Sequence, residues 1–227
     1  MHLALNDYEV IFRREETIAE IALDWRKESG EENSADFSIV KFVDSVLAKK
    51  FQKKDPLHFD FFDMEVGEKP AWVSYQPLTL HIDREVWEYA RLGDPTSRFI
   101  VAHEVGHLIL HDHHAKAFSS DTQARRNQIK EISAEWQANI FATHFLLPDH
   151  IVLAHNDPGD LAKSCSVTRE LAKDRVGALG EATRPCPKIE GDFCIRCGDF
   201  TKRVNGSIRC TTCGDVSSVG WAKAQSP

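Results

Sequence analysis

The sequence lacks any apolar run of the roughly 18 residues that a helix needs to cross a bilayer. Its most apolar stretch, Phe99–Leu110, is interrupted by two histidines and a glutamate. The first residues include Asp7 and Glu9, whereas a signal peptide has basic residues followed by a long apolar run. We therefore expect a cytoplasmic protein that is neither secreted nor inserted in a membrane.

The sequence also lacks an excess of positive charge. Its net charge is −7, with 28 Lys and Arg against 35 Asp and Glu, which disfavours a dedicated nucleic-acid-binding protein. The hydrophobic content of 42% is that of an ordinary globular chain and excludes a wholly disordered one. A length of 227 residues predicts one main domain with one or two small appendages.

The periodicity of the apolar residues predicts an α+β fold, in which a mostly helical domain packs a small sheet on a central helix. Thr17 and Glu20 match a capping box at the start of the first helix, which Gly30 ends. Further helices are expected at 36–51, 95–110 and 122–147, and strands at 57–61, 72–75 and 78–82.

We expect the chain to have four parts, which follow breaks in this pattern. They are the main domain (1–148), a helix-turn-helix-like segment that completes its cleft (149–182), a Pro-rich linker (183–190) and a cysteine-containing module (191–227).

The motif His103-Glu104-Val105-Gly106-His107 is an HExxH sequence on the predicted helix 95–110. Positions i and i+4 project from one helix face, so His103 and His107 can bind one metal ion. Glu104 lies beside the first ligand and can take a proton from a metal-bound water. The alternative is that both histidines lie on a solvated helix face, but the apolar surroundings of the motif disfavour it.

A catalytic zinc site needs a third protein ligand, and Glu135 is the best candidate. Apolar residues surround it in the next long helix, where an unpaired carboxylate would be costly to bury. Asn139, one turn later, is expected to orient a ligand. His111 lies one turn beyond His107, and we expect it to contact a ligand or the substrate, with a rim position or a ligand role as alternatives.

Two blocks of this sequence, 98–111 and 135–148, together resemble the ImmA/IrrE metallopeptidase family, and the resemblance extends over roughly residues 15–180. It implies a cytoplasmic zinc endopeptidase that cleaves a regulatory protein in a stress or mobile-element response. The substrate it implies is a helix-turn-helix transcriptional repressor or an antitoxin-like partner. By resemblance, His103, His107 and Glu135 hold the zinc and Glu104 is the base. The module 191–227 lies outside the usual family pattern.

The module 191–227 contains two CxxCG sequences, which predict a zinc ribbon with a closed, structural site. Its ligands would be Cys194, Cys197, Cys210 and Cys213. Asn205-Gly206 between them is typical of a hairpin turn. A pair of disulfides is the alternative, which a cytosolic location disfavours. The ribbon can bind protein or DNA, and Cys165 and Cys186 receive no role.

Three functions remain open on these residues. The first is an endopeptidase with one catalytic and one structural zinc ion, whose strand at Leu78–Asp83 pairs with an extended substrate. The second is a regulatory binding protein that docks a repressor or DNA and whose metal is structural. The third is a DNA-binding regulator that uses the ribbon and the segment 149–182, where Lys163, Arg169, Lys173 and Arg175 lie. Glu104 favours the first, because a purely structural site has no use for a base.

Overall fold

The structure is a computed structural model that describes residues 8–52, 56–111, 116–117, 130–155, 157–182, 201–204, 207–210 and 216–217. The chain divides into two compact units, Met1–Val176 and Gly177–Pro227, and helix α10 (Arg169–Ala182) spans the boundary. Within the described residues, no helix is long and apolar enough to cross a membrane.

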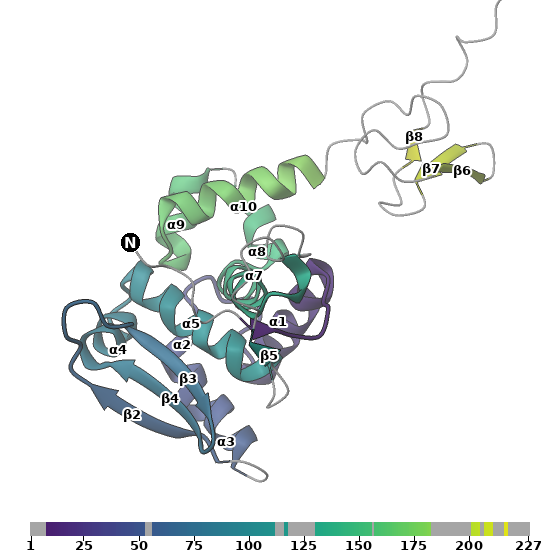
Figure 1. The fold of residues 1–227 in the computed structure, drawn as a ribbon. Helices are drawn as coiled ribbons and strands as arrows, with labels where there is room; N and C mark the ends of the chain where they lie inside the picture. Colours follow the sequence, from purple (N-terminus) through teal and green to yellow (C-terminus); the bar gives the residue numbers. More distant parts are fainter. Residues whose placement is uncertain are drawn as a thin grey trace, which may run out of the picture. The chain divides into compact units, whose positions relative to one another are not determined.

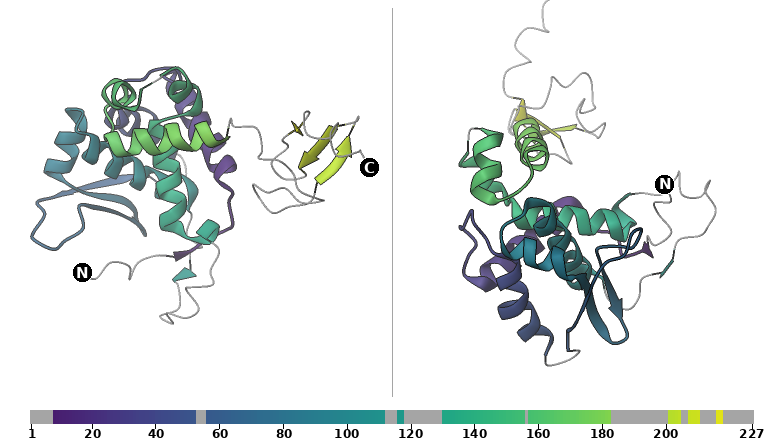
Figure 2. Two further views of the ribbon diagram at one scale, coloured as in Figure 1. Left: turned by 90° about the horizontal axis from the view of Figure 1, so that it is seen from above. Right: turned by 90° about the vertical axis from the view of Figure 1, so that its left-hand side faces the viewer.

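The first unit is α+β and mostly helical, as the sequence predicts (Figure 1). A three-stranded sheet packs on α5 (Pro95–Leu110), α5 packs on α7 (Ala134–Leu146), and α7 packs on α1 (Glu15–Ser29). Figure 2 shows the same succession of layers from two further directions. The described part of this unit also contains the α-helices α2 (Ile39–Phe42), α3 (Ala48–Phe51), α4 (Arg84–Arg91), α8 (Asp149–Leu153) and α9 (Pro158–Cys165).

Three of the predicted helices begin elsewhere than expected. The helix expected over 122–147 begins as α7 at Ala134, after a 3-10 turn at Lys130–Ile132, and its first expected residues, 122–129, lie outside the described ones. Helix α1 begins at Glu15, so Thr17 lies in its first turn and the expected capping box is wrong. Glu15 and Glu16 stabilise this start because carboxylates there complement the positive end of the helix dipole. The helix expected from residue 36 begins after Ser38, which accepts a hydrogen bond from Lys41. It continues through a π-helical turn, Val43–Leu47, into α3.

The sheet has the strand order β2 (His58–Phe62), β4 (Leu78–Asp83), β3 (Ala71–Tyr75). β4 is therefore the central strand, parallel to β2 and antiparallel to β3. The prediction that Leu78–Asp83 pairs with a substrate is wrong, because both of its edges are already occupied. β3 is the edge strand that α5 approaches.

A hydrogen-bonded network crosses all three strands on the face of the sheet that carries polar residues. The His81 Nδ1 atom lies 2.8 Å from Asp60 Oδ2, and the His81 Nε2 atom lies 3.0 Å from Ser74 Oγ. Trp72 stacks on the His81 ring, with 4.7 Å between the ring centroids. These contacts fix the edge strand β3 to the centre of the sheet.

The core between the helices is aromatic and includes two buried arginines. Phe37, Phe42, Phe141 and Phe145 pack with ring centroids between 4.9 and 5.9 Å apart. Arg26 donates hydrogen bonds to the carbonyl oxygens of Phe145, Glu31 and Ser34. Arg98 donates to the carbonyls of Phe37 and Cys165. The arginines thus join segments that are distant in the sequence.

The second unit contains a small antiparallel sheet, with the order β6 (Thr201–Val204), β7 (Ser207–Cys210), β8 (Val216–Ser217). Val204 pairs with Ser207, which leaves the two residues Asn205-Gly206 between the strands. The residues 194, 197 and 213 lie outside the described residues, and the structure describes the backbone of Cys210 but not its side chain. The zinc ribbon therefore stays a prediction.

Candidate metal centre

Helix α5 presents the HExxH residues at the centre of the first unit. Asp94 caps the helix by accepting a hydrogen bond from the Ser97 N–H at 2.8 Å, and Pro95 occupies the first turn, where no donor is needed. The helix ends at Leu110; the backbone of the next residue, His111, is extended, and its N–H still donates to the His107 carbonyl. Residues 103, 107 and 111 consequently lie on one face, one turn apart.

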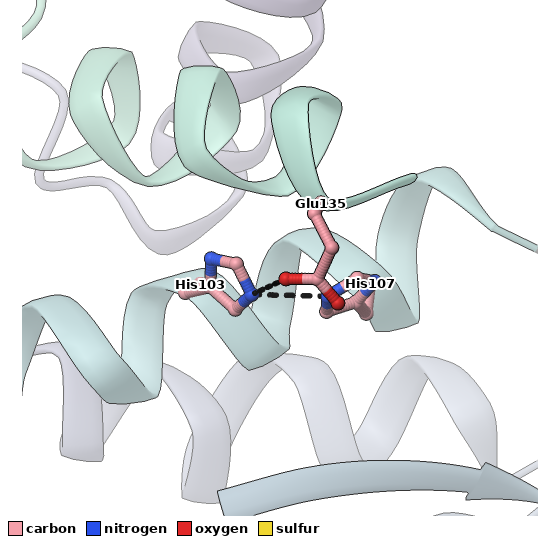
Figure 3. Close-up of side chains that lie close together, drawn as sticks. All are labelled: His103, His107 and Glu135. Carbon is pink, nitrogen blue, oxygen red and sulfur yellow. Dashed lines mark hydrogen bonds and ion pairs between the residues drawn. The ribbon is translucent and has the colours of Figure 1, made fainter. Parts of the chain in front are cut away.

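Three side chains from α5 and α7 converge on one point (Figure 3). The Nε2 atoms of His103 and His107 are 3.0 Å apart. The Glu135 carboxylate lies 3.3 Å from His103 Nε2 and 3.6 Å from His107 Nε2. Ligand atoms bound tetrahedrally to one zinc ion at about 2.1 Å are separated by about 3.4 Å. The spacing and chemistry of these three donors therefore fit a zinc ion.

Close packing of the two helices brings Glu135 to the histidines. Ser133 caps α7 by accepting from the Trp136 N–H at 3.0 Å, so Glu135 lies in the first turn of that helix. Gly106 faces α7, and a Cβ atom there would lie 3.1 Å from the Cα and O atoms of Ala138. The helices approach this closely only because residue 106 has no side chain.

Each histidine of the triad makes a second hydrogen bond through its Nδ1 atom. His103 Nδ1 lies 2.9 Å from Asn139 Oδ1, and His107 Nδ1 lies 3.0 Å from His111 Nδ1. His111 in turn contacts Gln137, with 3.3 Å between Nε2 and Oε1. Such partners orient a ligand ring and determine which nitrogen carries the proton.

Glu104 follows His103 in α5 and is buried. It is 7% exposed, and burial raises the pKa of its carboxyl to about 7, opposed by the neighbouring His103. A group with this pKa exchanges protons readily near neutral pH. Burial also lowers the pKa of His107 to about 3, with a further contribution from His103, so the His107 ring is neutral.

The triad opens into a cavity of about 720 Å³. Its walls are residues 68–73 and Tyr75 of β3 and the segment before it, the α5 residues around the motif, and the first turn of α7. Glu104 and the metal triad therefore share this cavity with the edge strand of the sheet. Tyr75 also donates from its hydroxyl to the His107 carbonyl at 3.3 Å.

The structure brings together all six predicted residues of this centre: His103, Glu104, His107, His111, Glu135 and Asn139. Two residues that contact it were missed. Tyr75 was recognised only as part of a strand, and its contact depends on the strand order. Gln137 is a buried amide in an apolar helix. Its burial indicates that the amide is hydrogen-bonded, but the sequence does not show to which residue.

The segment 149–182 forms helices α8, α9 and α10, and α8 and α9 both lie in the first unit. Of its four basic residues, Arg175 is 5% exposed and donates to the Leu147 carbonyl and Asp149. Lys163, Arg169 and Lys173 are exposed. Arg175 thus contributes to packing in the first unit. Cys165 is a buried free cysteine at the end of α9.

An HExxH helix that faces a glutamate on a second helix is the arrangement of metal-dependent peptidases. In agreement, residues 57–176 match the family model of the IrrE N-terminal-like domain, a peptidase family. The matched region exceeds half of the chain, and the protein belongs to this family.

Among solved structures, the chain is similar to a Mycobacterium tuberculosis transcriptional regulator, with a TM-score of 0.44 and 16% sequence identity. The similarity covers 76% of this chain and 49% of the other, so this chain spans about half the length of that protein. A comparison with curated protein sequences finds no match.

Proposed function

We propose that the protein is a cytoplasmic zinc-dependent endopeptidase that cleaves a regulatory protein. The observation that carries the proposal is the convergence of His103, His107 and Glu135, beside the buried Glu104, on one cavity. Membership in a peptidase family supports the same reaction class. His103, His107 and Glu135 would hold the ion, leaving one position open to water or substrate.

In the proposed peptide hydrolysis, a bound zinc ion and the side chains of the protein have separate roles. A bound zinc ion lowers the pKa of water and polarises a peptide carbonyl. Glu104 accepts a proton on its carboxylate and later donates it to the leaving nitrogen of the cleaved bond. Its pKa of about 7 suits both steps, because the group neither holds nor releases the proton too strongly. Asn139 and His111 keep the two imidazoles oriented through their Nδ1 atoms.

The edge strand β3 is the element best placed to bind the substrate backbone. The Asp83 N–H donates to the Pro70 carbonyl at 2.9 Å, so in this antiparallel pair residues 72 and 74 also bond toward β4. The peptide groups of the intervening residues, such as Val73, therefore point away from β4. An extended segment that adds to this edge would lie along the cavity and cross the metal centre.

The substrate class remains part of the proposal. A transcriptional repressor or antitoxin-like protein fits the ImmA/IrrE resemblance, and such a regulator would be cleaved in a stress or mobile-element response. The ribbon, with a second, structural zinc ion on Cys194, Cys197, Cys210 and Cys213, would recruit this partner. Recruitment of protein is favoured over DNA because the net charge of the chain is −7.

Substitutions that remove the proposed base, compared with substitutions that remove a proposed metal ligand, test the proposal. Glu104→Gln removes the proton acceptor but no ligand, so zinc should stay bound while cleavage falls by about 100-fold or more. His103→Ala and Glu135→Ala should lose both zinc and cleavage. Zinc is measured by chelator competition, and cleavage by mass spectrometry of a peptide library that reveals new termini.

Two results would contradict the proposal. Cleavage by Glu104→Gln at the wild-type rate would mean that Glu104 is not the base. Zinc binding by the wild-type chain without cleavage of either the library or candidate repressor proteins would instead favour a regulatory binding protein with a structural metal. A DNA mobility shift that weakens steeply with salt would favour a DNA-binding regulator.

A further inference from the structure

The buried amide of Gln137 has only one orientation that its surroundings allow. Its side chain is fully buried, and its Nε2 atom lies 2.8 Å from the Ile11 carbonyl and 2.7 Å from the Glu131 carbonyl. Carbonyl oxygens only accept hydrogen bonds, so the two amide protons must face them. The opposite orientation would place oxygen against two oxygens. The Oε1 atom of Gln137 therefore faces the other way.

That oxygen accepts hydrogen bonds from two directions. Arg13 donates from its guanidinium at 3.2 Å, and His111 Nε2 lies 3.3 Å away. Because Oε1 has no proton to give, His111 Nε2 must carry one. His111 is 5% exposed and shares this oxygen with the Arg13 guanidinium, so a second positive charge on its ring would be costly to bury. The ring is therefore neutral, and its Nδ1 atom has a lone pair.

The tautomer of His111 then determines which nitrogen of His107 carries a proton. His107 Nδ1 lies 3.0 Å from the bare Nδ1 of His111, so His107 must donate the proton of this hydrogen bond. A neutral His107 with its proton on Nδ1 has a lone pair on Nε2, the atom that faces His103 and Glu135. The amide of Gln137 thus selects the His107 tautomer that can bind a metal ion.

We propose that Gln137 is a positioning residue for the metal centre, which acts through His111 to hold His107 in its metal-binding tautomer. The proposal rests on the metal site described under the proposed function. The N-terminal segment contributes to this positioning, because the Ile11 carbonyl accepts from the Gln137 amide nitrogen and Arg13 donates to the Gln137 amide oxygen. His103 differs in that its partner Asn139 is exposed, and no other side chain among the described residues holds the Asn139 amide.

The first test measures tautomers in the full chain, after mild chelation that spares the thiolate site. Ring nitrogens with and without a proton have distinct 15N chemical shifts. Wild-type protein should show the proton on Nε2 of His111 and on Nδ1 of His107. Gln137→Leu should shift both rings toward a mixture, whereas Gln52→Leu, the same change at an exposed site, should not. Unchanged tautomers in folded Gln137→Leu would overturn the proposal.

The second test uses zinc affinity in two variants of the same residue. Gln137→Leu removes the acceptor for His111 and should weaken zinc binding by about tenfold. Gln137→Glu keeps an acceptor oxygen but loses both donated hydrogen bonds, so it should lower stability while retaining zinc affinity. A residue that only supports the fold would weaken zinc binding in both variants, which would contradict the positioning role.

A double-mutant cycle covers the case in which either variant folds poorly. If Gln137 acts only through His111, then Gln137→Leu should cost no further zinc affinity in a His111→Phe background. Additive losses would overturn the proposal. Failure of the metal site itself is separable from this outcome, because wild type and His103→Ala would then bind zinc equally.

Discussion

Gly106→Ala tests whether the close approach of α5 and α7 determines the metal centre. Alanine inside a helix is ordinarily more stable than glycine by about 1 kcal/mol. Here the new Cβ atom would lie 3.1 Å from two backbone atoms of Ala138 and 3.2 Å from Phe141 Cβ. Overpacking of this kind costs about 1–3 kcal/mol. The two effects largely offset, and we expect a net loss of about 0–2 kcal/mol.

The same substitution should also weaken zinc binding. The neighbouring backbone of α7 must move by a few tenths of an ångström, and α7 carries both Glu135 and Asn139. Zinc ligands tolerate displacements of only about 0.2 Å, so we expect the zinc affinity of the His₂Glu site to fall by about tenfold or more. Urea unfolding and chelator competition measure the two quantities separately.

Gly177→Ala is the matched control. Gly177 lies in helix α10, and a Cβ atom there would meet nothing within 4 Å. This variant should gain up to about 1 kcal/mol of stability and bind zinc as the wild type does. The reasoning fails if Gly106→Ala behaves in the same way, with added stability and unchanged zinc affinity.

Three further measurements test other parts of the molecule. Elemental analysis should give about two zinc ions per chain, and about one after mild chelation. The variant Cys194→Ser should release the ribbon zinc and still cleave peptides. A count of one zinc ion per chain before chelation would refute the two-site prediction. Val73→Pro should raise KM with little change in stability, because an edge strand tolerates proline; an unchanged KM would exclude pairing at β3. The hydrogen bond from His144 lowers the pKa of Glu15, so the stability difference between wild type and Glu15→Gln should shrink as the pH falls below 4.5; a constant difference would exclude this contribution.

The sequence predicted which residues meet at this centre because their positions depend on local geometry. The Asp94-Pro95 start and the apolar periodicity determine α5, and four-residue spacing then places His103 and His107 on one face. Glu135 was predictable because a carboxylate among apolar residues needs a partner. These arguments need only one helix at a time.

The features that were missed depend on how distant segments meet. Alternation identifies a strand but not its neighbours, so Leu78–Asp83 and Ala71–Tyr75 were not distinguishable as central and edge strands. The role of Gln137 requires Ile11 and Arg13, more than 120 residues away in sequence. The start of α1 was missed because the capping pattern at Thr17 competes with the acidic residues before it.

The two buried arginines set the smallest fragment that can be expected to fold. The region that matches the family model begins at residue 57, yet Arg98 at the start of α5 donates to the carbonyl of Phe37. The carbonyl of Phe145 in α7 likewise receives a hydrogen bond from Arg26. A fragment trimmed to 57–176 would lose both hydrogen bonds, at a cost of about 1.5–3 kcal/mol each, and would expose the aromatic core. The metal centre and the N-terminal helices are therefore expected to fold only together.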